Sequence, residues 1–380
     1  MSSCTYEALG VRPVVNAAAT LTRLGGSRMP AEVLEAMAAG ARCFVDLFEL
    51  QRRAGERIAE LTNNEACYVS SGAAAGMAIA IAGCIAGTDA ARIARLPECD
   101  GAPAEVIIHR SHRNGYDHAA RQTGARLVEV GMAHTTQSWE LEAALSPRTA
   151  CVLYFAGAHY AGAARPLPEV VEVAHSRGVP VLVDAAAQIP PVSNLWRFTR
   201  ELGADAALFS GGKGLRGPQS AGLVLGRRDL IEACIANGPP HHNLGRPMKV
   251  GKEEMLGMLA AVDWTLRQDE PALLARYEAT VQGWLSGLAD LPGVMAERGF
   301  PSEAGQPHAR AIVRFGPPCR LDRDAVVAAL WDGDPRVAVG TVGEDAIALN
   351  PQTLEPGEEA EVLLALRRVL APAAAAAAAR

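Results

Sequence analysis

Short apolar runs alternate with segments of helical spacing along the first two thirds of this chain. The apolar run at 66–70 (A-C-Y-V-S) precedes an alanine-rich helical segment at 73–86, and the same succession then repeats. Short continuous apolar runs between helices are typical of parallel strands buried on both faces. We therefore predict the α/β class, with a mostly parallel sheet flanked by helices. Further strands are predicted at 106–109, 126–130, 149–155, 179–184 and 206–210, and helices at 31–61 (broken near Gly55), 116–123, 138–144 and 167–177.

The last third of the chain has a different pattern. Two long helical segments, 253–270 and 271–291, are followed by apolar runs and helices that indicate a small α+β domain. That domain is expected to hold strands at 311–315 and 346–349 and helices at 324–330 and 358–370. The predicted organisation is an N-terminal arm with the first helix (1–45), a large domain (46–262), a small C-terminal domain (263–370) and an alanine-rich tail (371–380).

Composition narrows the class of protein. Hydrophobic residues make up 49% of the chain, which is enough for a sizeable core, whereas the net charge is −6 without a cluster of Lys or Arg. Proteins that hold a phosphate backbone usually have a basic surplus, so we expect no nucleic-acid partner. No apolar run reaches the length of a membrane span, and no secretory signal is visible. The eight cysteines are scattered without a C-x-x-C pair, so free thiols in the cytoplasm are expected and a metal site is not.

Three local motifs carry candidate chemistry. The first is the junction Ser70-Ser71-Gly72-Ala73, between a predicted strand and a predicted helix. Small residues let the backbone approach an anion, and the N–H groups at a helix start bind phosphate. The alternative is an ordinary helix cap.

The second motif is Asp184, at the end of the apolar run V-P-V-L-V-D. A carboxylate at the carboxyl end of a parallel strand points into the crevice where α/β sheets bind ligands. A helix cap, a metal ligand or a ribose ligand would also explain an aspartate there.

The third motif is A-L-F-S-G-G-K-G-L-R-G-P, in which Lys213 lies among Gly211, Gly212 and Gly214. A lysine that forms an imine needs a mobile backbone and a lowered pKa. Ser210 lies three residues before Lys213, where its hydroxyl could meet the same phosphate. A nucleotide-binding loop is the competing interpretation, but Gly214 stands where a P-loop has Ser or Thr.

Together these motifs predict a pyridoxal 5′-phosphate (PLP) site. Asp184 would pair with the pyridinium nitrogen and keep it protonated, so that the ring can withdraw electrons. Lys213 would carry the cofactor as a Schiff base and, once released, act as a general base. The phosphate would be held by Ser71, Gly72, Ala73 and Ser210.

The sequence also resembles fold-type I PLP enzymes, in the branch that contains selenocysteine synthase (selenium transferase) and D-glucosaminate-6-phosphate ammonia lyase. The resemblance implies a large PLP domain, a small C-terminal domain, and a homo-oligomer with shared active sites. The similar segments are 14–27, 70–76, V-D-A-A-A-Q at 183–188, S-G-G-K-G-L-R-G-P-Q-S-A-G at 210–222, R-P-M-K-V-G-K-E-E at 246–254 and L-N-P-Q-T-L at 349–354.

The resemblance assigns further residues to the site. It implies that Gln188 contacts the cofactor, that Gly217 reaches the phosphate of the neighbouring protomer's cofactor, and that His112 covers the cofactor ring. It implies that Arg246 and Lys249 face the substrate. His159 stands where the family usually has a Ser-Asn pair, and is expected at the cofactor's 3-oxygen or the substrate.

A substrate carboxylate needs a bidentate partner, usually Arg. Arg314 and Arg336, both in the small domain, are the two options for that partner.

The leading functional hypothesis is a PLP-dependent lyase that acts on an amino acid or amino-sugar acid. It would remove the α-proton, eliminate a β-substituent, and release ammonia and a 2-oxo acid. An amino-acid racemase or epimerase is the runner-up, with His112 or His159 as its second acid/base. A selenium or sulfur transferase, a PLP-binding protein without activity, and a nucleotide-binding module are further alternatives.

Overall fold

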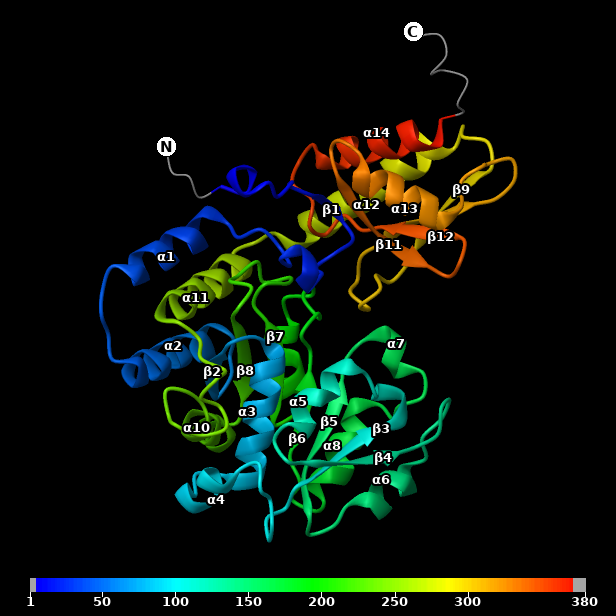
Figure 1. Ribbon diagram of the computed structural model, residues 1–380. Helices are drawn as coiled ribbons and strands as arrows, with labels where there is room; N and C mark the ends of the chain where they lie inside the picture. Colours follow the sequence, from blue (N-terminus) through cyan, green and yellow to red (C-terminus); the bar gives the residue numbers. More distant parts are fainter. Residues whose placement is uncertain (1–4, 372–380) are drawn as a thin grey trace. The chain divides into compact units, whose positions relative to one another are not determined.

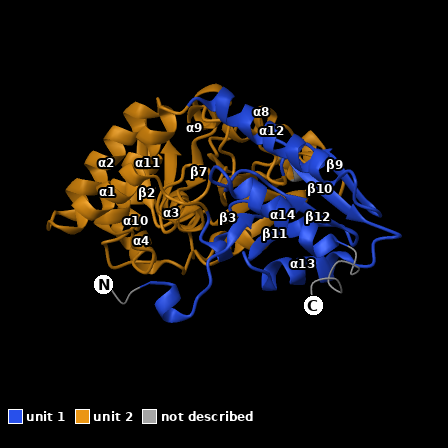
Figure 2. Cartoon of the chain, turned by 90° about the horizontal axis from the view of Figure 1, so that it is seen from above, with its two compact units in different colours: residues 1–26, 269–302, 307–380 blue, residues 27–268, 303–306 orange. Residues whose placement is uncertain are grey.

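The computed structural model describes residues 5–371 and divides them into two compact units. The larger unit contains residues 27–268 and 303–306; the smaller contains the described residues before 27, 269–302 and those from 307 onward (Figure 2). The boundary predicted after residue 262 falls inside helix α11 (Lys252–Leu266), whereas the compact units change at Gln268. Most of the alanine-rich tail lies outside the described residues.

The larger unit is built on a seven-stranded sheet with the order β2-β8-β7-β6-β5-β3-β4 (Figure 1). All neighbours pair in parallel except β8, which is antiparallel to both β2 and β7. The predicted α/β class is therefore confirmed. The strands are β2 (Ala66–Ser70), β3 (Glu105–His109), β4 (Arg126–Val130), β5 (Thr149–Phe155), β6 (Val181–Asp184), β7 (Ala206–Ser210) and β8 (Gly222–Gly226).

Helices cover both faces of this sheet. Alternate residues of the same strands enter two separate apolar clusters: Val152 and Val183 lie in one, Leu153 and Leu182 in the other. The first cluster also holds residues of α1, α2, α6, α8 and α11, and the second holds residues of α3, α5 and α10. The helices are α1 (Ala31–Ala41), α2 (Leu47–Leu61), α3 (Ala73–Ala86), α4 (Ala90–Arg95), α5 (His118–Arg121), α6 (Ser138–Ala144), α7 (Ala158–Ala161), α8 (Leu167–His175), α9 (Asn194–Trp196), α10 (Arg228–Asn237) and α11, with short 3-10 turns at Arg110–His112 and Gly115–Asp117 and a π turn at Arg197–Glu201.

The helical segment at 31–61 does not break near Gly55, so that prediction is wrong. Gly55 lies inside α2, where it permits close approach to β2: an added Cβ would overlap the carbonyl oxygen of Cys67. The chain instead breaks before Asp46, whose side chain accepts the backbone N–H groups of Phe48 and Glu49 and so caps α2.

The smaller unit is a five-stranded sheet with the order β1-β11-β12-β10-β9. Its N-terminal strand pairs in parallel with β11, and the other neighbours are antiparallel. Trp284, Val326 and Leu366, from three different helices, share one apolar cluster with the strands. The elements are β1 (Val15–Ala17), α12 (Glu270–Leu288), β9 (Val294–Gly299), β10 (Arg310–Phe315), α13 (Arg323–Asp332), β11 (Val337–Val342), β12 (Ala346–Leu349) and α14 (Glu358–Leu370), with 3-10 turns at Glu7–Leu9 and Thr22–Leu24.

Candidate active site

The three predicted motifs meet at the carboxyl edge of the large sheet. Asp184 ends β6 and Ser210 ends the adjacent, parallel β7. Because β8 is antiparallel to both of its neighbours, β2 runs in the same direction as β7. Gly222, the first residue of β8, pairs with both Ser70 and Ser210, so the turn after β2 and the Lys213 loop lie at one edge.

The turn after β2 has the form of an anion cradle. Gly72 has a φ of +105°, an added Cβ there would meet only open space, and α3 begins at Ala73 without a side-chain cap. The Ser71 hydroxyl donates to the carbonyl oxygen of Met248 (2.8 Å), so its proton is already used within the protein. The N–H groups at the start of α3 are thus the donors that suit a phosphate here.

The Lys213 loop is held from both sides by backbone contacts. Its ends meet where the N–H of Gly211 donates to the carbonyl of Ala221 (2.8 Å). The Ser27 hydroxyl donates to the carbonyl of Lys213 (2.8 Å). On the other side, an added Cβ at Gly214 would overlap the carbonyl oxygen of Ile189. The main chain on either side of Lys213 is therefore fixed, although its neighbours are glycines.

Buried Asp184 and half-buried Lys213 interact electrostatically. Burial raises the pKa of Asp184. The hydrogen bond from the N–H of Ala186 (2.9 Å) and the positive charge of Lys213 lower this pKa, but by less. Burial lowers the pKa of Lys213, and the negative charge of Asp184 offsets only part of this effect. A buried carboxylate is stabilised by a cationic partner such as a protonated ring nitrogen. A lysine with a lowered pKa has more of the neutral amine that forms an imine. The two groups therefore fit PLP.

His112 is fully buried within an aromatic cluster, close to Phe155, which is the partner of Asp184 in the sheet. Its ring lies 4.7 Å from that of Tyr154, 5.6 Å from that of Tyr160 and 4.9 Å from that of His109, between centroids. The N–H of Phe155 donates to His112 Nδ1 (3.2 Å). Because Nδ1 accepts that bond, the neutral ring carries its proton on Nε2.

The comparisons with known proteins agree with this geometry. A model of the aminotransferase class-V family matches residues 50–249. The chain belongs to this family. It is 35% identical to the 5′-C-glycyluridine monooxygenase-decarboxylase of a Streptomyces species, over 94% of this chain and 90% of the relative. It is 32% identical to D-glucosaminate-6-phosphate ammonia lyase of Salmonella typhimurium, over 98% of this chain and 100% of the relative.

A solved structure of D-glucosaminate-6-phosphate ammonia-lyase matches the fold with a TM-score of 0.85 and 31% identity, and the match covers 97% of this chain and 99% of that one. The L-seryl-tRNA(Sec) selenium transferase of Moorella thermoacetica is 30% identical, over 95% of this chain and 82% of the relative. The predicted resemblance is thus confirmed. This class-V aminotransferase-family protein is a fold-type I PLP enzyme of the lyase class.

Other predicted residues have partners of their own in this class-V protein. The side-chain amide of Gln188 donates to the carbonyl oxygen of Ala304 (2.8 Å). Arg314 forms ion pairs with Glu297 and Asp345 within the smaller unit. Arg336, in the same unit, stacks on the Trp331 ring and donates to its carbonyl oxygen. His159 belongs to α7, but its side chain lies outside the described residues.

Arg246 and Lys249 line a pocket of about 710 Å³ in the larger unit. Within the described part of the chain, neither forms an ion pair, although Glu253 and Glu254 also line the pocket. The bond from Ser71 to Met248 ties this loop to the turn after β2. Gly217 lies in the Lys213 loop, where its N–H donates to Gly211 (2.8 Å).

Two residues of the site were missed in the sequence. Ser27 holds Lys213 from a distance of 186 residues along the chain. Tyr160 contacts the His112 ring and interacts electrostatically with Asp184. Both residues had a signal in the sequence. Ser27 is the last residue of the segment 14–27, which resembles the family, and Tyr160 directly follows the predicted site residue His159.

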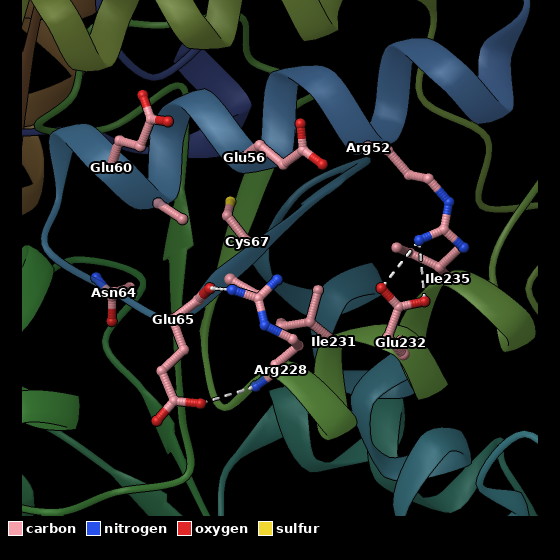
Figure 3. Close-up of a pocket in the computed structure, with 12 residues that line it drawn as sticks. Arg52, Glu56, Glu60, Asn64, Glu65, Cys67, Arg228, Ile231, Glu232 and Ile235 are labelled. Carbon is pink, nitrogen blue, oxygen red and sulfur yellow. Dashed lines mark hydrogen bonds and ion pairs between the residues drawn. The ribbon is translucent and has the colours of Figure 1, made fainter.

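A second pocket in the larger unit lies at the opposite end of β2. Figure 3 shows Arg52 paired with Glu232 and Arg228 bonded to Glu65 in its lining. Cys67 lies at this pocket too, and burial raises the pKa of its thiol. Its ion-paired lining distinguishes this pocket from the site at the carboxyl edge. Among residues 5–371 there is no cluster of side chains suited to a metal ion, and no helix long and apolar enough to cross a membrane.

Proposed function

We propose that this lyase acts on an amino acid or amino-sugar acid, removes its α-proton and expels a β-substituent, and that water then hydrolyses the resulting imine to ammonia and a 2-oxo acid. The electrostatic interaction between buried Asp184 and half-buried Lys213, whose pKa is lowered, carries the proposal. The likeness to D-glucosaminate-6-phosphate ammonia lyase over almost the whole chain supports it.

Each residue contributes a defined step. Asp184 would hold the ring nitrogen in its protonated form, and the N–H groups of Gly72 and Ala73 would bind the phosphate beside Ser210, with Gly217 of a neighbouring copy. When bound, PLP supplies an electron sink for the charge left on the α-carbon. Lys213, as a neutral amine, would take the α-proton and give it to the departing β-substituent.

Substrate recognition is assigned to basic residues around the site. Arg246 and Lys249 would bind an acidic group of the substrate, a role that their position beside the turn after β2 supports. Arg314 or Arg336 would bind the α-carboxylate. Arg314 would first have to exchange Glu297 or Asp345 for that carboxylate.

The orientation of His112 bears on the racemase alternative. Reprotonation from the opposite face needs a second acid/base. His112 Nδ1 already accepts the N–H of Phe155, so this ring suits a donor and a cover for the cofactor rather than a base. His159 is the remaining residue that would have to serve, and its role at the cofactor or substrate stays a proposal.

Loss of carbon dioxide is a second outcome that deserves a test. The relative with 35% identity is a monooxygenase-decarboxylase, and it covers 94% of this chain. Incubation with candidate amino acids and amino-sugar acids in deuterated water, with ammonia, carbon dioxide and oxygen uptake followed together, separates the outcomes. We expect ammonia with a 2-oxo acid. Deuterium exchange without a 2-oxo acid would contradict the lyase proposal, and carbon dioxide with oxygen uptake would replace it.

We also propose a cytoplasmic homo-oligomer with shared active sites. The surface around the α1–α2 connection supports it: Phe44 is 103% exposed, and Leu34, Val45 and Phe48 are exposed beside it. Phe44 and Val45 line the same pocket as Arg246 and Lys249. A second copy that covers these apolar side chains would complete that pocket. The seven described cysteines are all unpaired, which suits a reducing compartment.

A further inference from the structure

Two buried glutamines join distant segments of the larger unit. Gln188 Nε2 donates to the carbonyl of Ala304 (2.8 Å), and Gln306 Nε2 donates to the carbonyl of Ile189 (2.8 Å). Each segment thus supplies one side-chain donor and one backbone acceptor. We call these four residues the amide latch. Both glutamines are at least nine-tenths buried.

The latch abuts the Lys213 loop. The carbonyl of Ile189 lies so close to Gly214, the residue after Lys213, that no side chain would fit there. Asn194 holds the neighbouring carbonyl of Gln188 (2.7 Å). A shift of the Gln188–Ile189 peptide would therefore move either Gly214 or the latch.

The same segment connects to the other half of the cofactor site. Four residues before Gln188 lies Asp184, and the intervening backbone is bonded to β7: the N–H of Ala185 donates to Leu208 (2.9 Å), and the N–H of Ser210 donates to Ala186 (3.4 Å). Asp184 and Lys213 are thus linked through one short backbone segment that the latch holds at its far end.

Hydrogen bonds give this contact its direction. Apolar side chains would fill the space equally well. Two hydrogen bonds donated in opposite directions by side-chain amides also fix the position and the orientation of a peptide. Loss of one donor leaves a buried carbonyl with one fewer partner.

We propose that Gln188 and Gln306 are positioning residues that set the orientation of Lys213 toward the cofactor by fixing the Gln188–Ile189 peptide against Gly214. The inference rests on the proposed attachment of PLP to Lys213. Gln188 then acts on the cofactor through this peptide instead of touching it.

The test uses Gln188→Met, Gln306→Met and the double variant in the full chain, because Met keeps the length of the side chain and removes the donor. Gln268→Met is the matched control: its amide also donates to a backbone carbonyl, that of Trp264 (3.0 Å), but on an exposed helix end. The readouts, without substrate, are the ratio of the absorption bands of the lysine–PLP adduct at one pH and the rate of PLP release to a trapping reagent. Thermal unfolding is followed in parallel.

Each single variant is expected to change the band ratio and to speed PLP release about fivefold, the equivalent of one neutral hydrogen bond. The double variant should change both by less than the product of the single effects, because the two bonds hold the same peptide. Gln268→Met should leave both as in the natural protein. Lower thermal stability with an unchanged band ratio and release rate would overturn the proposal.

A measurement on the natural protein guards against variants that do not fold. Loading with PLP should raise amide hydrogen-exchange protection at 303–306 as well as at 211–217, and leave α4 unchanged. An adduct spectrum without any change at 303–306 would refute the latch alone. The absence of an adduct spectrum in the natural protein would instead contradict the proposed attachment of PLP to Lys213.

Discussion

The hydroxyl of Ser27 donates to the main-chain carbonyl of Lys213 at 2.8 Å, and the N–H of Ser27 donates to Gly212 at 2.9 Å. Ser27→Ala removes the hydroxyl, which also lies 3.0 Å from the Gly212 carbonyl, and keeps the bond from the N–H. We expect about a fivefold fall in kcat, because Lys213 loses one neutral restraint, with only a small change in Tm. Steady-state kinetics and thermal unfolding check this. Ser176→Ala, which removes an exposed hydroxyl bonded to Val173, is the matched control, and an equal loss there would contradict the role of Ser27.

Only three lysines occur in the sequence: Lys213, Lys249 and Lys252. Borohydride reduction and peptide mass mapping should therefore find the pyridoxyl group on the peptide that contains Lys213. Lys213→Ala should lose this adduct and the activity, whereas Lys249→Ala should keep the adduct. A pyridoxyl group retained elsewhere in Lys213→Ala would refute the assignment.

Asp184→Asn removes the carboxylate without a change of size. We expect kcat to fall about 10²-fold or more, because a preorganised charge at the developing carbanion is lost. The pKa of Lys213 should fall further, because the negative charge of Asp184 raises it. Spectral titration and kinetics measure the two effects. Asp205→Asn provides the contrast, since Asp205 accepts the N–H of Val181 away from the site and should affect Tm rather than chemistry.

His109 makes stability depend on pH. Burial, with a smaller effect of Arg165, lowers its pKa from 6.5 to about 4. The unfolded chain therefore binds more protons between these values, and the folded state loses up to about 3 kcal/mol as the pH falls through that window. His109→Gln, which keeps an acceptor but does not titrate, should show a shallower loss in urea unfolding at pH 7 and pH 4. Parallel curves for the two proteins would contradict this.

Phe44→Asp places a charge on the exposed α1–α2 connection. If a second copy covers Phe44, the variant should dissociate, because a buried unpaired carboxylate is costly. Light scattering after size exclusion measures the mass. Leu364→Asp, at another exposed apolar residue, should leave the mass unchanged. An oligomer that survives Phe44→Asp would move the interface elsewhere.

The features that depend on a local pattern of residues could be predicted from the sequence. The strand ends at Ser70, Asp184 and Ser210 follow from apolar runs that stop at a polar residue, and their convergence follows from parallel pairing. The short β8, flanked by glycines, was not predicted, because it lies directly after the lysine loop and has only three apolar residues.

Contacts between distant segments could not be predicted. No periodicity in the chain indicates that Ser27 meets Lys213, or that the Gln188 amide bonds to Ala304. The low helix propensity of glycine favours a break at Gly55. The helix continues there because only glycine lets α2 approach the backbone of Cys67 so closely.

The antiparallel direction of β8 has a consequence for how this enzyme could diversify. The segment from Gly211 to Ala221 leaves and re-enters the sheet at the same edge, and its ends are joined by a backbone bond. The register of β7 and β8 is therefore set without the residues between them, so substitutions in this segment would act on Lys213 and not on the sheet. Gly222 is different: a side chain there would come within 2.7 Å of Gly72 and disturb both halves of the site at once.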